Sequence, residues 1–121
     1  MATPEIPPKV QHQLAQFQQL QQQAQAIINQ KVQLQLQLRE TERALEELGK
    51  MVADSEVYKS AGALLIKSDK VTLEKELSER KETLELRVKT IEKQEERIRK
   101  RLEELQQELR QALGVTTPSA G

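Results

Sequence analysis

Few residues of this sequence could carry out covalent chemistry. Its single histidine, His12, has no cysteine anywhere in the chain to accompany it, so a nucleophilic pair or a metal centre lacks its parts. No glycine-rich phosphate-binding motif occurs, and the many carboxylates fall on predicted solvated helix faces, where nothing would raise their pKa. We therefore expect no enzyme, no cofactor and no metal.

Apolar residues in the middle of the chain could instead bind another molecule. Between Gly49 and Asp69 the hydrophobic spacing becomes strand-like. The β-prone runs 57–59 and 63–67 flank Ser60-Ala61-Gly62, and Gly62 can supply a turn with positive φ, so the stretch predicts a β-hairpin.

One chain could not bury both faces of this hairpin. Leu64, Leu65 and Ile66 are consecutive, so alternation makes both faces of their strand apolar. An isolated two-stranded hairpin is also marginal in water. We therefore predict that copies from several chains pair their edges into a shared sheet or barrel. The alternative is a disordered connector with an incidental apolar run.

A second apolar group lies where the two chain ends should meet. It comprises Val10, Leu14, Phe17, Leu20, Leu105, Leu109 and Leu113. Two helices cannot fully cover so many apolar side chains, and a partly exposed apolar patch usually marks an interaction surface. Two interpretations stay open, a binding surface and a frayed end that packs on itself.

Two long helical segments should position these groups. From Val10 onward, apolar residues recur at heptad a and d positions, which are Val10, Gln13, Phe17, Leu20, Ala24, Ile27, Lys31, Leu34, Leu38, Thr41, Leu45 and Leu48. A second seam consists of Leu77, Lys81, Leu84, Val88, Ile91, Glu95, Ile98, Leu102, Leu105, Leu109 and Ala112. Neither helix can bury its seam alone, so we expect an antiparallel coiled coil.

The predicted fold is mostly α, with two long helices that form an antiparallel coiled-coil hairpin and one short β-hairpin that assembles into an oligomeric β-barrel. The expected segments are a flexible lead (1–8), helix 1 (9–49), a linker and β-hairpin for assembly (50–69), helix 2 (70–113) and a flexible tail (114–121).

Composition excludes several other functions. Hydrophobic residues make up 36%, aromatic residues 2% and charged residues 31% of the chain, a profile typical of long helices. The formal net charge is zero, and basic residues alternate with acidic ones, so no nucleic-acid surface is indicated. No apolar run approaches the roughly 20 residues that span a bilayer. We expect a cytoplasmic protein without membrane contact.

The stretch EVYKSAGALLIK and the segment ETLELRVKTIEKQEERI resemble the β-type subunit of prefoldin, a hexameric chaperone, most closely in its archaeal form. The resemblance covers residues 5–114. It implies that two α-type and four β-type subunits join their hairpins into a double β-barrel from which the coiled coils project. It also implies that the hexamer holds unfolded polypeptides at the coiled-coil tips without ATP and passes them to a group II chaperonin.

Transferred to this sequence, the resemblance assigns subunit assembly to Val57, Tyr58, Leu64, Leu65 and Ile66, and client binding to the apolar group at the chain ends. The α-type subunit, non-native polypeptides and the chaperonin are the expected partners. The alternative function is a structural coiled-coil scaffold or dimerisation protein.

Overall fold

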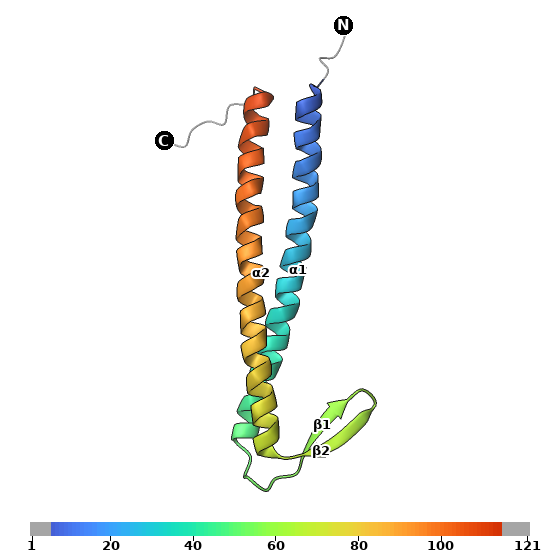
Figure 1. Ribbon diagram of the computed structural model, residues 1–121, viewed down its shortest axis with the longest axis vertical. Coiled ribbons are helices and arrows are strands. Elements are labelled where there is room, and N and C mark those ends of the chain that lie inside the picture. Colours follow the sequence, from blue (N-terminus) through green and yellow to red (C-terminus); the bar gives the residue numbers. More distant parts are fainter. Residues whose placement is uncertain (1–5, 115–121) are drawn as a thin grey trace, which may run out of the picture. The chain divides into compact units, whose positions relative to one another are not determined.

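The computed structural model describes residues 6–114, which contain two helices and two strands. In chain order they are α1 (Pro8–Gly49), β1 (Val57–Ala61), β2 (Leu64–Ser68) and α2 (Lys70–Ala112) (Figure 1). The described residues form two compact units: a terminal unit of residues 6–30 and 91–114, and a central unit of residues 31–90. The hairpin lies wholly within the central unit.

Backbone hydrogen bonds mark where helix α1 begins and ends. Proline is well tolerated at the first helical position, because the missing N–H would lack an intrahelical acceptor there. Helix α1 starts with Pro8, and the carbonyl of Pro7 accepts hydrogen bonds from the amides of Val10 and Gln11, both at 3.0 Å. After Gly49, the amide of Met51 still donates to the carbonyl of Leu48 at 3.1 Å, which closes a last turn.

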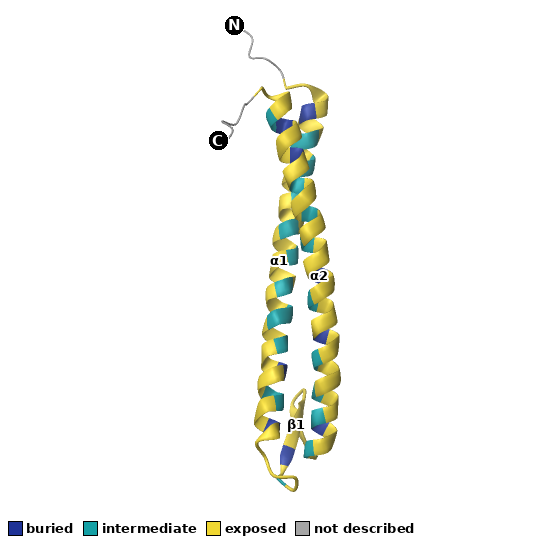
Figure 2. Cartoon of the chain, turned by 90° about the vertical axis from the view of Figure 1, so that its left-hand side faces the viewer, coloured by how far each residue is buried: buried dark blue, intermediate teal, exposed yellow. Residues whose placement is uncertain are grey.

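The heptad pattern coincides with the buried side of the helices in each unit. Every a and d residue of the first predicted seam is buried or half-buried, and so is every residue of the second seam except Ala112 (Figure 2). The polar position Thr41 is only 4% exposed. Its hydroxyl donates to the carbonyl of Gln37 at 2.8 Å, so this buried polar group keeps a hydrogen-bond partner.

Strands β1 and β2 form an antiparallel two-stranded sheet in which Val57 pairs with Ser68 and Ala61 with Leu64. The turn therefore consists of Gly62 and Ala63, whereas the sequence pattern placed it one to two residues earlier. Gly62 has a φ of 60°. A two-residue turn with glycine first suits the right-handed twist of a hairpin, which explains the shift.

Asp69 begins α2 as its N-cap. Its carboxylate accepts one hydrogen bond from the Thr72 amide at 2.8 Å and another from the Thr72 hydroxyl at 2.9 Å. These bonds stabilise the ionised carboxylate, the backbone bond most strongly, and hold the pKa of Asp69 below its usual value. The cap thus fixes where the chain leaves β2 and becomes helical.

The mostly helical fold with two long helices and one antiparallel β-hairpin is confirmed. The barrel itself would require further chains and stays a prediction. Most of the predicted flexible lead and tail lies outside the described residues. Within residues 6–114, neither helix contains a stretch apolar and long enough to cross a membrane.

The cap predicts a pH-dependent stability. Because the folded pKa of Asp69 is lowered, its contribution is present above about pH 4 and is lost as the pH falls through the folded pKa. Asp69→Asn still caps the helix but neither titrates nor carries the favourable charge. We expect wild type to melt at a higher temperature than Asp69→Asn at pH 7, measured by circular dichroism, and this advantage to shrink below pH 4. A constant advantage down to pH 2.5 would contradict the assignment.

Candidate functional site

The hairpin exposes apolar side chains on both faces. The strand register places Leu64 and Ile66 on the same face as Val57, and Leu65 on the opposite face with Tyr58. Leu64 is 66% exposed, Leu65 75%, Tyr58 54% and Ile66 49%. Among the residues assigned to assembly, only Val57 is buried in this chain. The other four offer an uncovered apolar surface.

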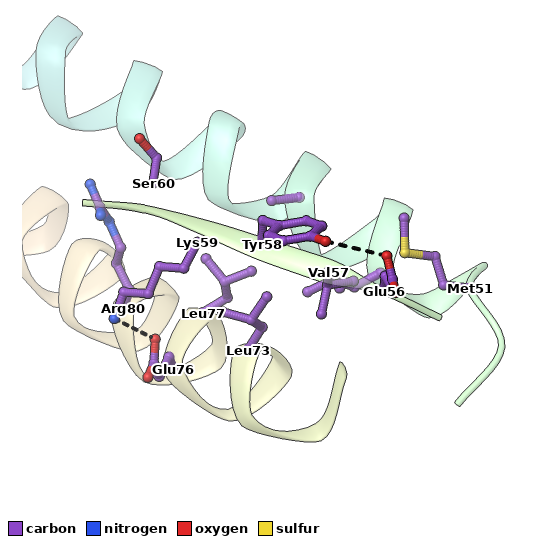
Figure 3. Close-up of a pocket in the computed structure, with 12 residues that line it drawn as sticks. Met51, Glu56, Val57, Tyr58, Lys59, Ser60, Leu73, Glu76, Leu77 and Arg80 are labelled. Carbon is purple, nitrogen blue, oxygen red and sulfur yellow. Dashed lines mark hydrogen bonds and ion pairs between the residues drawn. The ribbon is translucent and has the colours of Figure 1, made fainter. Parts of the chain in front are cut away.

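Val57 anchors the hairpin to the central unit. It is 6% exposed and packs in a cluster with Leu48 of α1 and Leu73 of α2, against which Leu77 also lies. Figure 3 shows β1 running past these side chains. Beyond Val57 the strand does not pack closely, because a groove of about 580 Å³ remains between β1, the end of α1 and the first turns of α2.

Polar contacts also hold the hairpin. The ammonium of Lys59 lies 3.0 Å from the carboxylate of Glu76 in α2 (Figure 3). Glu56 accepts a hydrogen bond from the Tyr58 hydroxyl at 3.2 Å and lies 3.9 Å from the Lys67 ammonium. Tyr58 and Lys67 are cross-strand partners, so this one carboxylate contacts both strands.

A hydrogen bond joins the backbone of Met51, in the segment before the hairpin, to a side chain of α2. The Lys70 ammonium donates to the carbonyl of Met51 at 2.7 Å and lies 3.6 Å from Glu74. This contact holds the end of α1 and the start of α2 together in the central unit. The chain reversal is therefore fastened independently of the hairpin strands.

The apolar group at the chain ends is mostly packed within the terminal unit. Val10, Leu105 and Leu109 are buried, and Leu105 has no exposed surface. Leu14, Phe17 and Leu20 are half-buried, whereas Leu113 is 50% exposed. The structure thus favours a self-packed end for the three buried residues and leaves Leu113, with the half-buried ones, accessible to a ligand.

A polar contact closes the same end. The amide of Gln13 donates to the carboxylate of Glu108 at 3.1 Å, which joins α1 and α2 in the terminal unit. Glu108 also lies 3.9 Å from Arg101. Gln13 and Glu108 also line a groove, together with Lys9, Val10, Gln111 and Ala112.

Sequence reasoning missed Ile6, Lys59 and Glu76. Ile6 is 43% exposed just before α1, beside the predicted end group. Lys59 and Glu76 lie 17 residues apart in different elements, so no helical or strand periodicity pairs them. Only their opposite charges near the hairpin could have suggested a contact.

The charged face of α2 shows no sign of catalytic tuning. The Arg99 guanidinium donates two hydrogen bonds to Glu96 and one to Glu103, and this pairing lowers the pKa of Glu96. These side chains are exposed, where ion pairs contribute little. Within residues 6–114 no group of acidic or histidine side chains could hold a metal ion.

Comparison with known proteins identifies the family. Residues 11–115 match the family described as "Prefoldin subunit". This chain belongs to the prefoldin subunit family. A prefoldin subunit beta of Methanothrix thermoacetophila is 55% identical over 117 residues, 97% of this chain and 98% of the relative. A prefoldin subunit beta of Archaeoglobus fulgidus is 50% identical with the same coverage.

A solved prefoldin structure has the same fold. The crystal structure of the prefoldin beta subunit from Thermococcus strain KS-1 is 38% identical and similar with a TM-score of 0.83, covering 96% of this chain and all of that chain. The resemblance to an archaeal β-type prefoldin subunit is therefore confirmed. The chain is a prefoldin chaperone subunit, and such subunits assemble with one another.

The terminal unit predicts unequal costs for two identical substitutions. Leu105→Ala should lower the free energy of unfolding by about 2–5 kcal/mol, because it leaves a cavity around a fully buried side chain. Leu113→Ala should cost about 0.5 kcal/mol or less, since Leu113 is half exposed. Urea unfolding of both variants measures this difference. Equal losses would mean that the end does not pack as described.

Proposed function

We propose that this chain is the β-type subunit of a hetero-hexameric prefoldin that acts as an ATP-independent holdase. Four copies assemble with two α-type subunits in the cytoplasm. The hexamer captures unfolded polypeptides at the coiled-coil tips and delivers them to a group II chaperonin. The subunit has no catalytic activity and uses no cofactor.

The observation that carries the assembly role is the hairpin with two uncovered faces. Leu64, Leu65 and Ile66 are each about half exposed or more, although consecutive apolar residues in a strand are normally buried on both sides. A closed barrel of hairpins would bury both faces and would also pair the free strand edges. Hairpins from several subunits can therefore bury the apolar faces and pair the strand edges that a single chain leaves exposed.

Client binding is assigned to the end group of the terminal unit. Leu113, exposed, and Leu14, Phe17 and Leu20, half-buried, offer a small apolar surface at each tip. Val10, Leu105 and Leu109 of the same group are buried and add little to this surface. One such tip would bind weakly, but several tips that contact one unfolded chain raise the overall affinity without any new kind of contact.

A holdase without ATP is consistent with the chemistry of the chain. No glycine-rich nucleotide motif occurs in the sequence. Binding through apolar contacts is non-directional and scales with the apolar area removed from water. Such a surface suits clients that share exposed apolar residues but no sequence.

A second candidate is a structural coiled-coil scaffold. Val32 and Leu36 in the central unit lie four residues apart on α1 and are 52% and 45% exposed. Residues at this spacing share one helix face, so this face could pack on a helical partner. Such a scaffold would need neither the hairpin nor an α-type subunit to assemble.

Leu65→Asp distinguishes the two candidates. A charge on the most exposed apolar residue of β2 would have to be buried in the barrel, which is strongly unfavourable. We expect wild type mixed with an α-type subunit to reach the hexamer mass in light scattering. Leu65→Asp should stay unassembled while circular dichroism shows unchanged helix content.

Leu86→Asp is the matched control, because Leu86 is 65% exposed on α2 and lies outside the hairpin. It should assemble as wild type does. A hexamer that forms with Leu65→Asp would remove the barrel from the account. An ordered dimer of wild type alone, unchanged by the α-type subunit, would support the scaffold.

A further inference from the structure

The hairpin touches the helices of its own chain through very few side chains. Val57, the first residue of β1, is its only buried residue. The remaining strand residues are exposed, or half-buried in the case of Ser68. The groove of about 580 Å³ beside β1 shows that packing does not hold the strand flat against α1 or α2. Apolar burial at a single residue restrains the position of the hairpin but not its direction.

Lys59 provides a second point of attachment. It lies two residues after Val57, so both side chains leave the same face of β1. That face is turned toward α2, where the Lys59 ammonium lies 3.0 Å from Glu76 (Figure 3). Within residues 6–114, this is the only hydrogen bond or ion pair between a hairpin strand and α2. Together with the burial of Val57, the pair therefore restrains the angle between β1 and α2.

Two other charged residues lie near this pair. Arg80 and Glu56 line the same groove, but Glu56 is engaged with Tyr58 and Lys67. Lys59 and Glu76 are both about half exposed, at 49% and 46% of their side-chain surface. A pair at such exposure changes an equilibrium by only about two- to fivefold. It can therefore select one hairpin direction among several without locking the strand.

We propose that the Lys59–Glu76 ion pair orients the hairpin and so positions its apolar faces for the partner subunits. This inference rests on the proposed assembly through the hairpin. The two residues act as positioning residues, because they hold the strand and need not touch a partner. A barrel that takes one hairpin from each of several chains requires every hairpin to arrive at a compatible angle, so small preferences multiply over the copies.

Charge reversal tests the pair. Lys59→Glu places two carboxylates together, and Glu76→Lys places two ammonium groups together, so like charges repel in either variant. Each variant should lower hexamer formation with the α-type subunit at low salt by about tenfold or more. The double variant Lys59→Glu/Glu76→Lys restores opposite charges and should recover assembly to within about threefold of wild type. A loss caused only by altered folding would not be rescued in this way.

A distance measurement observes the hairpin directly. The sequence contains no cysteine, so Ala61→Cys in β1 and Glu79→Cys in α2 place two spin labels at defined positions. Both residues are exposed in the central unit. Electron–electron double resonance on the full-length, unassembled chain should give a distance distribution with one dominant peak when the wild-type pair is present. Lys59→Glu should broaden it, and the double reversal should narrow it again.

The outcomes separate this inference from the proposed function. Leu65→Asp should abolish assembly yet leave the distance distribution as it is in wild type. An unchanged distribution in Lys59→Glu overturns the orienting role, whether or not hexamers form. A broadened distribution with undiminished assembly also overturns the proposal, because the angle would not matter. Failure of wild type to assemble at all contradicts the proposed function, while the distances still decide whether the pair orients the hairpin.

Discussion

The structure depends on one constraint, which is that a hairpin of two five-residue strands cannot bury both of its faces within one chain. Val57 reaches the central unit and is covered, whereas Leu64, Leu65 and Ile66 are left in water. The two helices leave these three side chains of β2 exposed. We propose that this uncovered apolar surface drives assembly with other subunits, because a shared sheet would bury it.

The two helices, unlike the hairpin, bury most of their apolar seam residues within the chain. Their seam residues, apart from Ala112, are buried or half-buried in both units, and the exposed faces consist largely of glutamine and of charges of both signs. Polar residues within the seam keep partners, as Thr41 does through Gln37. In the terminal unit, Val10, Leu105 and Leu109 are buried, whereas Leu113 is half exposed. We propose that the small accessible apolar surface of this unit makes weak, repeated contacts with unfolded chains.

Much of this fold was predictable because it follows from periodicity. Heptads indicated both helices, and three consecutive apolar residues beside Gly62 indicated the hairpin with two apolar faces. The turn lies one to two residues later than predicted. Strand pairing and the φ of Gly62 determine its position, and β-propensity does not. The degree of burial at the chain ends and the Lys59–Glu76 pair were not predictable, since both depend on contacts between residues far apart in sequence.

The central claim is that assembly resides in the hairpin and client binding at the chain ends. Site-specific photo-crosslinking in the assembled hexamer tests it most directly. A photoreactive residue in place of Leu113, which is 50% exposed just after the end of α2, is compared with one in place of Leu86, which is 65% exposed within α2. We expect a denatured client to crosslink to position 113 and not to position 86. Crosslinking of equal strength at position 86, or none at 113, would contradict the division of roles.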